Sequence, residues 1–283
     1  MDGQSILEQI HAAYYQLTAA ERKVADYVLT QYADVQFMSI TQLAEECGVA
    51  EATISRFCRS MNLKGFNAFK MELARHSVSS AVSPKSLSEP DTDTFEGRCR
   101  QAGQLAIDAV SQTLELLRED TVNAAVDLLD RAGRVLCIGN GGSLITAGEC
   151  SNHFATISNK FYALPDSHLQ LAAIATMSRD DVILLFSYSG ATINSLEVLE
   201  LAKSRGVRTI LITRFLKSPA AKLADVVLRC GSNEGPFQPG STPAKMAQLV
   251  LIDVLYQEFY HRHPAESERN IEDIAAALAC KHI

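Results

Sequence analysis

Three hydroxyl side chains surround a glycine in residues 187–192, which read SYSGAT, and this grouping could bind an anion. The hydroxyls belong to Ser187, Ser189 and Thr192. The apolar run 181–186 before them predicts a buried strand, and a helix is expected to start after them, so that its first amide N–H groups would face the same anion. Gly190 would let the backbone turn tightly against the ligand. The chemistry indicated is recognition of a phosphate group.

A second glycine-rich turn, GNGGS at 139–143, follows the apolar run 134–138 and also precedes a predicted helix. Gly142 and Ser143 open that helix. Both turns are expected at the carboxyl ends of parallel strands, where open α/β sheets bind ligands. Neither a G-x-G-x-x-G fingerprint nor a P-loop lysine is present. The alternative is a pair of tight strand-to-helix turns without a ligand.

Residues 39–59 have the pattern of a DNA-reading helix-turn-helix. Ala44 is small enough for two helices to cross, Gly48 suits the turn, and Ile54 is a β-branched core residue at the required distance. The second helix of this motif lies in the major groove and reads base edges with its first turns. The alternative is a helical hairpin used only for packing.

The second helix, predicted at 51–61, separates apolar from polar side chains. Ile54, Phe57 and Cys58 are expected to be buried, and the outward, DNA-contacting residues are expected to be Thr53, Ser55, Arg56 and Arg59. Arg56 could bind a guanine edge bidentately, while Lys64 and Lys70 would contact backbone phosphates. Ala50 leaves the start of this helix without a capping side chain, and Asn62 can adopt the left-handed conformation that ends it.

The net charge of −7 does not favour DNA binding, but charge varies along the chain. Residues 53–76 carry five Lys or Arg and one Glu, whereas residues 1–52 are acidic. Phosphate contacts act within a Debye length of about 8 Å, so the local excess matters more than the total. An ordinary solvated charged face would give the same composition.

The helical periods predict an all-α first domain at 1–76, with helices at 4–16, 18–32, 39–46, 51–61 and 66–76. The Ser-rich, Pro-containing segment 77–93 reads as a linker. Residues 94–283 are expected to form the second domain, with helices at 94–118 and 121–131 before its core at 134–262.

In that core, five short apolar runs near 134–139, 161–164, 181–187, 209–213 and 225–230 alternate with helical stretches near 143–157, 167–176, 192–205, 218–223 and 241–262. A final helix is expected after residue 263. This alternation predicts an α/β domain with a five-stranded parallel sheet flanked by helices.

Seven scattered cysteines without a C-x-x-C pair indicate reduced thiols, and we expect no metal site and no cofactor. No apolar run is long enough for a membrane span, and the first residues lack a secretory pattern. The chain is therefore expected to be cytoplasmic.

With both motifs in this order, the chain resembles RpiR-type bacterial transcription regulators. Residues 1–76 resemble their helix-turn-helix domain through ITQLAEECGVAEATISRFCRSMNLKGFNAFK, and residues 134–262 resemble the sugar isomerase (SIS) domain through GNGGS, FSYSGAT and PAKMAQLVLIDVLY. The resemblance implies a regulator, usually a repressor and sometimes an activator, of sugar metabolism genes. It implies double-stranded operator DNA and a phosphorylated sugar as partners, and a homodimer or homotetramer. Ser143, Ser187, Ser189 and Thr192 match the positions that hold the sugar phosphate.

SIS domains also occur in isomerases, which need a base near the substrate carbon. Glu234, in the loop before the long helix at 241–262, is the candidate for that role. It could equally hydrogen-bond sugar hydroxyls without chemistry, or lie exposed. The leading expectation is a ligand-controlled regulator that is not an enzyme. The alternatives are a sugar-phosphate isomerase using Glu234, and a phosphosugar-binding oligomer whose helical domain contacts protein. The segment NEGPFQPGSTPAK departs from the Ser/Arg-rich family pattern, which leaves the sugar open.

Overall fold

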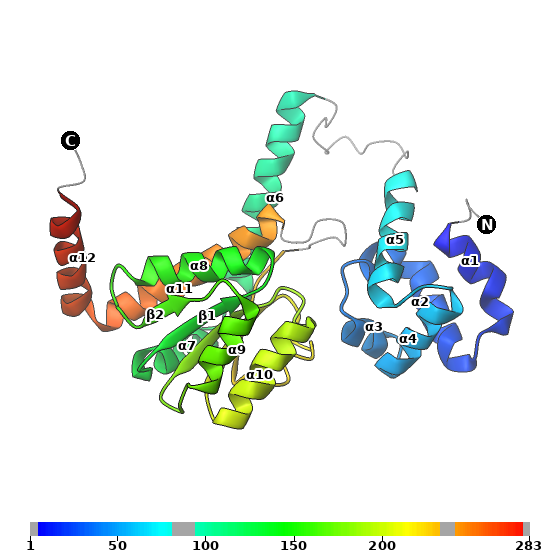
Figure 1. Cartoon of the computed structure of the whole chain (residues 1–283). Helices are drawn as coiled ribbons and strands as arrows, with labels where there is room; N and C mark the ends of the chain where they lie inside the picture. The colour runs from blue at the N-terminus through cyan, green and yellow to red at the C-terminus, as the bar shows by residue number, and fades with distance from the viewer. Residues whose placement is uncertain (1–4, 81–93, 233–240, 280–283) are drawn as a thin grey trace. The chain divides into compact units, whose positions relative to one another are not determined.

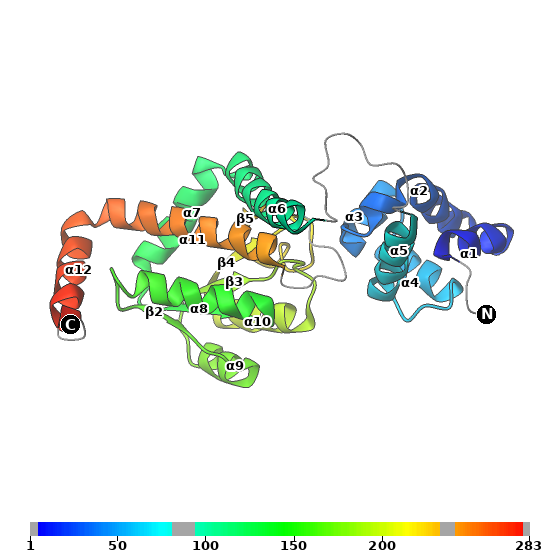
Figure 2. The same cartoon turned by 90° about the horizontal axis from the view of Figure 1, so that it is seen from above.

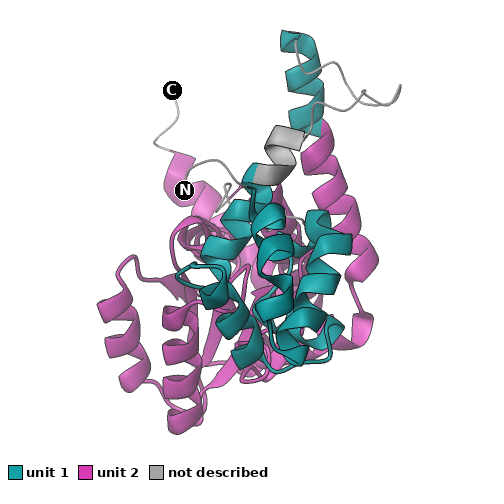
Figure 3. Cartoon of the chain, turned by 90° about the vertical axis from the view of Figure 1, so that its right-hand side faces the viewer, with its two compact units in different colours: residues 1–103, 233–239 teal, residues 104–232, 240–283 magenta. Residues whose placement is uncertain are grey.

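The computed structural model describes residues 5–80, 94–232 and 241–279 (Figure 1). The described residues separate into two compact units (Figure 3). Residues 5–80 and 94–103 belong to the first, and residues 104–232 and 241–279 belong to the second. One helix, α6 (Phe95–Leu116), contributes residues to both units.

The first unit is helical, as the sequence predicts. Its elements are α1 (Ile6–Ala13), the 3-10 turn η1 (Tyr14–Gln16), α2 (Ala19–Val35), α3 (Ile40–Glu46), α4 (Glu51–Ser60) and α5 (Phe66–Ser80). The hydroxyl of Thr18 accepts from the N–H of Glu21, whose carboxylate accepts from the Thr18 N–H, so the predicted capping box starts α2. Helix α5 continues past residue 76, where the first domain was expected to end.

The core of this unit is built from buried apolar side chains of all its helices, α1 to α5. Phe57 of α4 meets Phe69 of α5 edge to face, with ring centroids 5.5 Å apart. Aromatic pairs in this geometry add to the burial of apolar area. One face of α4 is therefore packed in the core, and its opposite face is exposed.

The second unit contains the predicted parallel sheet, in the strand order β2-β1-β3-β4-β5. The strands are β1 (Val135–Gly139), β2 (Phe161–Ala163), β3 (Val182–Phe186), β4 (Arg208–Thr213) and β5 (Val226–Arg229). All four pairings are parallel. The helices are α7 (Glu119–Arg131), α8 (Gly142–Phe154), α9 (Ser167–Ala175), α10 (Ile193–Arg205), α11 (Thr242–Arg262) and α12 (Pro264–Leu278).

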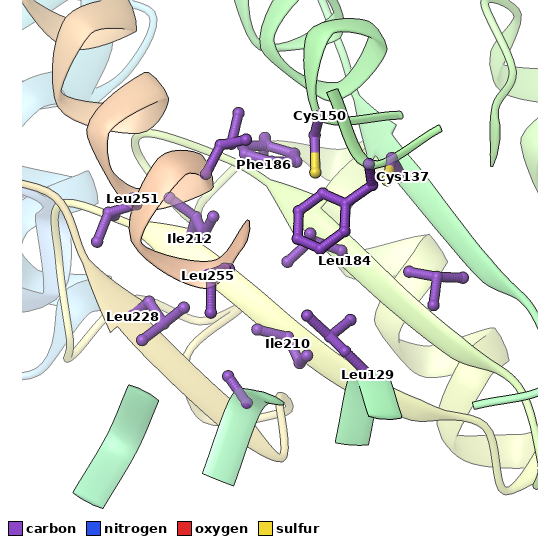
Figure 4. Close-up of a cluster of buried hydrophobic side chains, with 14 of the residues drawn as sticks. Leu129, Cys137, Cys150, Leu184, Phe186, Ile210, Ile212, Leu228, Leu251 and Leu255 are labelled. Carbon is purple, nitrogen blue, oxygen red and sulfur yellow. The ribbon is translucent and has the colours of Figure 1, made fainter. Parts of the chain in front are cut away.

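Helices cover both faces of this sheet (Figure 2). Helices α7, α8 and α11 pack on the face that carries Cys137, Leu184 and Ile210, and Figure 4 shows this cluster. Helices α9 and α10 pack on the opposite face, against Ile138 and Leu185. The inner strands β1 and β3 are buried along their whole length, which explains their unbroken apolar sequence.

One predicted helix is wrong: residues 218–223 form turns. Ala220 donates its N–H to the carbonyl of Gly190 at 2.9 Å, and Ala221 donates to the Ser218 hydroxyl at 3.3 Å. The bond to Gly190 ties the segment to the turn after β3, so its backbone does not follow its local helical preference. Within the described residues, no helix has the length and apolar character needed to cross a bilayer.

Candidate functional site

The turn between α3 and α4 has the geometry that the spacing of Ala44, Gly48 and Ile54 predicts. Gly48 has φ +60°, a conformation that other residues rarely adopt. The next residue, Val49, donates its N–H to the Ala44 carbonyl at 2.9 Å, which closes the turn. Ala44 and Ile54 are both buried where the helices meet. The two helices therefore hold a fixed relation.

Helix α4 exposes two of its predicted DNA contacts fully. Arg56 and Arg59 lie at the surface and Ser55 is half-buried, while the predicted core residues, Ile54, Phe57 and Cys58, are buried. Lys64, in the turn after α4, is exposed. Four of the five predicted DNA-binding side chains are therefore accessible at least in part.

Thr53 is the exception, because it is buried at 4% exposure and does not face outward as predicted. It precedes Phe57 by one helical turn, so it shares the inner face of α4. Its hydroxyl accepts a hydrogen bond from Arg56 Nη2 at 3.2 Å. Thr53 therefore positions Arg56 and does not present itself to a ligand.

The ends of α4 agree with the sequence. Ala50 caps its start without a side-chain hydrogen bond, and Asn62 after its end has φ +59°. Lys70, expected at a phosphate, donates to the Met38 carbonyl at 3.0 Å and so links α5 to the segment before α3. At least one of its three donors is already used.

A buried carboxylate of α2, not predicted from the sequence, forms a hydrogen bond with the end of α4. Glu21 accepts a hydrogen bond from the Ser60 hydroxyl at 3.1 Å, as well as from Thr18. The Thr18 hydrogen bond is the main cause of a pKa below the usual Glu value, and the charge of Arg56 acts in the same direction. Glu21 is therefore ionised and favours the cation next to it.

In the second unit, the two glycine-rich turns lie side by side at the edge where β1 and β3 end. The strands pair with Gly139 opposite Phe186, so Asn140 and Ser187 are the next residues on neighbouring strands. Between these strands the sheet order reverses, because β2 lies on one side of β1 and β3 on the other. Ligands of open α/β sheets bind at such switch points.

A chain of hydroxyls organises the turn after β3. Ser195 donates to the Ser187 hydroxyl at 2.9 Å, and the Thr192 and Ser195 hydroxyls lie 2.7 Å apart. Each hydroxyl has one hydrogen to donate, and that of Ser195 goes to Ser187. Thr192 is therefore the donor in its bond with Ser195. The hydrogen of Ser187 remains available as a donor at the end of this series of hydroxyls. Ser195 is only 2% exposed and was not predicted as a site residue; its position at the third residue of α10 was the available signal.

Gly190 has the backbone conformation of a tight turn, and it also packs closely against a neighbouring loop. Its φ is +58°, and a Cβ placed there would lie 2.1 Å from Ser218 Oγ and 3.2 Å from Thr213 Oγ1. The glycine therefore lets the turn after β3 pack against the loop after β4. Ser189 is half-buried, and its hydroxyl accepts from the Ala191 N–H at 3.3 Å.

The turn after β1 contains a polar group with no partner. The side-chain Nδ2 of Asn140 is buried and makes no hydrogen bond among the described residues. An unpaired buried donor is costly, so a ligand that accepts from it would be favoured. Gly142 and Ser143, the predicted ligand residues nearby, are half-buried. Glu234 lies outside the described residues, within which no group of three or more metal-ligating side chains occurs.

Residues 4–80 match the model of the helix-turn-helix domain of the rpiR family, and residues 128–257 match the SIS domain. The chain is 31% identical over 283 residues to an uncharacterised HTH-type transcriptional regulator of Caldanaerobacter subterraneus subsp. tengcongensis, covering 98% of each chain. The chain belongs to the RpiR family of HTH-type transcriptional regulators. This RpiR-family regulator is thus a DNA-binding transcription factor with an SIS domain.

Two further relatives are similar to this RpiR-family regulator over almost their whole length. The HTH-type transcriptional regulator HexR of Escherichia coli K12 is 29% identical over 276 residues, which cover 97% of this chain and 94% of HexR. A solved structure of Vibrio vulnificus NanR, complexed with ManNAc-6P, has a TM-score of 0.87 and 27% identity, covering 99% of this chain and 100% of NanR.

Proposed function

We propose that this regulator responds to a phosphosugar bound where β1 and β3 end, and that it reads operator DNA with α4. One observation supports this proposal most directly: two hydrogen-bond donors lie on the adjacent ends of β1 and β3, at the switch point of the sheet. These are the unpartnered Asn140 amide and the Ser187 hydroxyl that ends the hydroxyl chain. A phosphate offers several acceptor oxygens to such donors. NanR, similar over 99% of this chain, is complexed with a phosphosugar.

The phosphate would be held by the residues of the two turns, namely Gly142, Ser143, Ser187, Ser189, Gly190 and Thr192. Helices α8 and α10 begin directly after these turns, and the free N–H groups of their first residues favour an anion there. Glu234, in the segment before α11, would meet sugar hydroxyls in this scheme.

On the DNA side, Arg56 would bind a base edge in the major groove. Thr53 and Glu21 support that arginine from within the unit. Ser55, Arg59 and Lys64 would contact bases or phosphates nearby. A homodimer or homotetramer in the cytoplasm would present two copies of α4 to two half-sites, and repression is the expected mode of control.

A line of hydrogen bonds leads from the ligand turn to α6. The Tyr188 hydroxyl, between the two serines of the turn, donates to the Ser232 carbonyl at 2.6 Å. The neighbouring Gly231 bonds to Thr113 of α6. Helix α6 is the element that the chain enters after the helix-turn-helix unit. A ligand that moves Tyr188 would therefore change how α6 is held, which is the differential contact that coupling requires.

The test is operator binding at fixed near-physiological salt with a panel of sugar phosphates, using DNA from upstream of the gene. We expect one phosphosugar to change the affinity. Ser189→Ala should abolish that response with DNA binding unchanged, whereas Ser204→Ala, an exposed serine on α10, should leave it intact.

A response that survives Ser189→Ala unchanged would contradict the ligand assignment. Turnover of any sugar phosphate on the panel by the same preparation would support the isomerase alternative.

A further inference from the structure

We propose that the second unit carries a further ligand site, for a small monocarboxylate with an apolar body, between the α6–α7 junction and the end of β5. The cavity there has a volume of about 340 Å³, within the range of about 300–1,000 Å³ typical of small-molecule sites. It contains no residue of the phosphosugar turns at 139–143 or 187–192. Its lining residues are Glu115, Leu116, Leu117, Arg118, Thr121, Leu216, Val227, Leu228 and Arg229.

Arg229, the last residue of β5, supplies an uncompensated cation at the cavity wall. Its Nε is buried and has no hydrogen-bond partner among the described residues, and none of the ion pairs between described residues includes it. Burial, and then the charge of Arg214, lower the pKa of Arg229 from its ordinary value. Both facts mean that the half-buried guanidinium has no paired anion among the described residues. A carboxylate would accept from Nε and relieve the repulsion from Arg214.

Arg118 adds a second cation at the same cavity. It stands just before α7, and its Nε lies 3.5 Å from Asp120 Oδ1, with both side chains about three-quarters exposed at 77% and 75%. Such an exposed pair is weak and exchanges easily. The only carboxylate in the lining is Glu115, which is exposed. The lining therefore carries a net positive charge and fits an anion.

The uncharged lining residues favour a ligand whose uncharged part is apolar. Five of the nine lining residues are aliphatic, and Thr121 is the only hydroxyl among them. A sugar would lose hydrogen bonds to water against this surface without replacing them. A branched aliphatic chain would instead bury apolar area. The site therefore differs in chemistry from the phosphosugar site, and it does not depend on that site being correctly assigned.

The probe is 3-methylbutanoate, and its neutral isostere 3-methylbutanamide is the control for charge. Saturation-transfer NMR and calorimetry on the full chain should show binding of the carboxylate and at least tenfold weaker binding of the amide, since a charge-assisted hydrogen bond contributes roughly one to two orders of magnitude. Arg229→Gln should weaken carboxylate binding by about the same factor. Arg131→Gln, an exposed arginine at the end of α7, should leave it unchanged.

Leu216→Phe tests the same cavity without changing Arg229. Leu216 is 51% exposed, so the larger ring can be accommodated by the fold while it narrows the cavity. We expect carboxylate binding to fall in this variant and to persist in Ser189→Ala. Equal binding of carboxylate and amide, no binding of either, or binding that only Ser189→Ala removes would each overturn the proposal.

Discussion

Gly231 donates its backbone N–H to the buried Thr113 hydroxyl at 2.9 Å, and this bond joins the segment after β5 to the second half of α6. Thr113 in turn donates to the Ala109 carbonyl at 2.6 Å, so its hydroxyl is used in both directions. A Cβ at Gly231 would lie 2.6 Å from the backbone of Gln112 and Thr113. The contact is therefore specific to these two residues.

Thr113→Val keeps the shape of the side chain and removes this hydroxyl. The Gly231 N–H would then be buried without a partner, which should cost about 1–3 kcal/mol of unfolding free energy. Chemical denaturation measures the loss, and the phosphosugar response of DNA binding should weaken as well. Thr176→Val, where an exposed hydroxyl bonds only within its own helix end, should cost much less. Equal losses in the two variants would mean that the link to Gly231 contributes nothing.

Gly190→Ala separates backbone strain from steric contact. Strain at a positive φ costs about 1 kcal/mol or more, and the new Cβ would also overlap Ser218. The control is Gly206→Ala, which has φ +70° and open space around the added carbon. We expect a larger drop in melting temperature for Gly190→Ala, together with loss of the phosphosugar response. A drop no larger than that of the control would show that the loop after β4 can yield.

Arg56→Ala should weaken operator binding with the fold intact. A bidentate contact to a base contributes roughly 1–3 kcal/mol of discrimination, so operator affinity should fall about 5- to 150-fold while binding to random DNA falls less. Fluorescence anisotropy with both DNAs measures the ratio. Arg205→Ala, an exposed arginine at the end of α10, is the matched charge control. A uniform loss on both DNAs would instead identify Arg56 as a phosphate contact.

Ala50→Ser should stabilise the helix-turn-helix unit. Ala50 has the extended backbone of an N-cap, with φ −78° and ψ 150°, but provides no side-chain hydrogen bond to α4. A serine hydroxyl there would accept from a first-turn N–H and add about 1 kcal/mol. Thermal unfolding should show the increase. An unchanged or lower melting temperature would mean that the first turn of α4 has no free donor to cap.

The ionisation of Asp181 should make the free energy of unfolding depend on pH. It is buried and accepts two hydrogen bonds from Arg134, at 3.1 Å and 2.8 Å, and one from the Ser178 N–H at 2.8 Å. The Arg134 hydrogen bond is the main cause of a pKa below the ordinary Asp value of 3.8. The pKa of Asp181 is lower in the folded state than in the unfolded state. The ionised carboxylate therefore stabilises the fold at pH values above the unfolded-state pKa. This stabilisation is lost as the pH falls through the folded-state pKa.

Asp181→Asn should therefore cost about 1–2 kcal/mol at pH 7, a figure kept low because the Arg134 side chain is 50% exposed. The cost should shrink in denaturation measurements at pH 3 and below. Asp108→Asn, at an exposed position on α6, is the matched control for replacing a carboxylate by an amide. A cost that stays constant with pH would rule out the ionised carboxylate as its source.

The sequence alone predicted the strands, most of the helices, the five-stranded parallel sheet and the helix-turn-helix followed by an SIS domain. Local rules decide these features: apolar period, capping residues such as Thr18, and glycine at positive φ, as at Gly48. Each depends on neighbours within a few residues, which the sequence displays directly.

Only the tertiary structure decided the orientation of Thr53, the turns at 218–223 and the packing of Gly190 against the loop after β4. Thr53 is buried because α4 packs a wide face on α2 and α5, and polarity alone cannot reveal the width of that face. The carbonyl of Gly190 holds residues 218–223 out of a helix through a contact made about 30 residues away in the chain. Ser195, Asn140 and the bond from Tyr188 to Ser232 likewise acquire their meaning from partners on other elements, because hydrogen bonds between distant segments leave no periodic trace in a sequence.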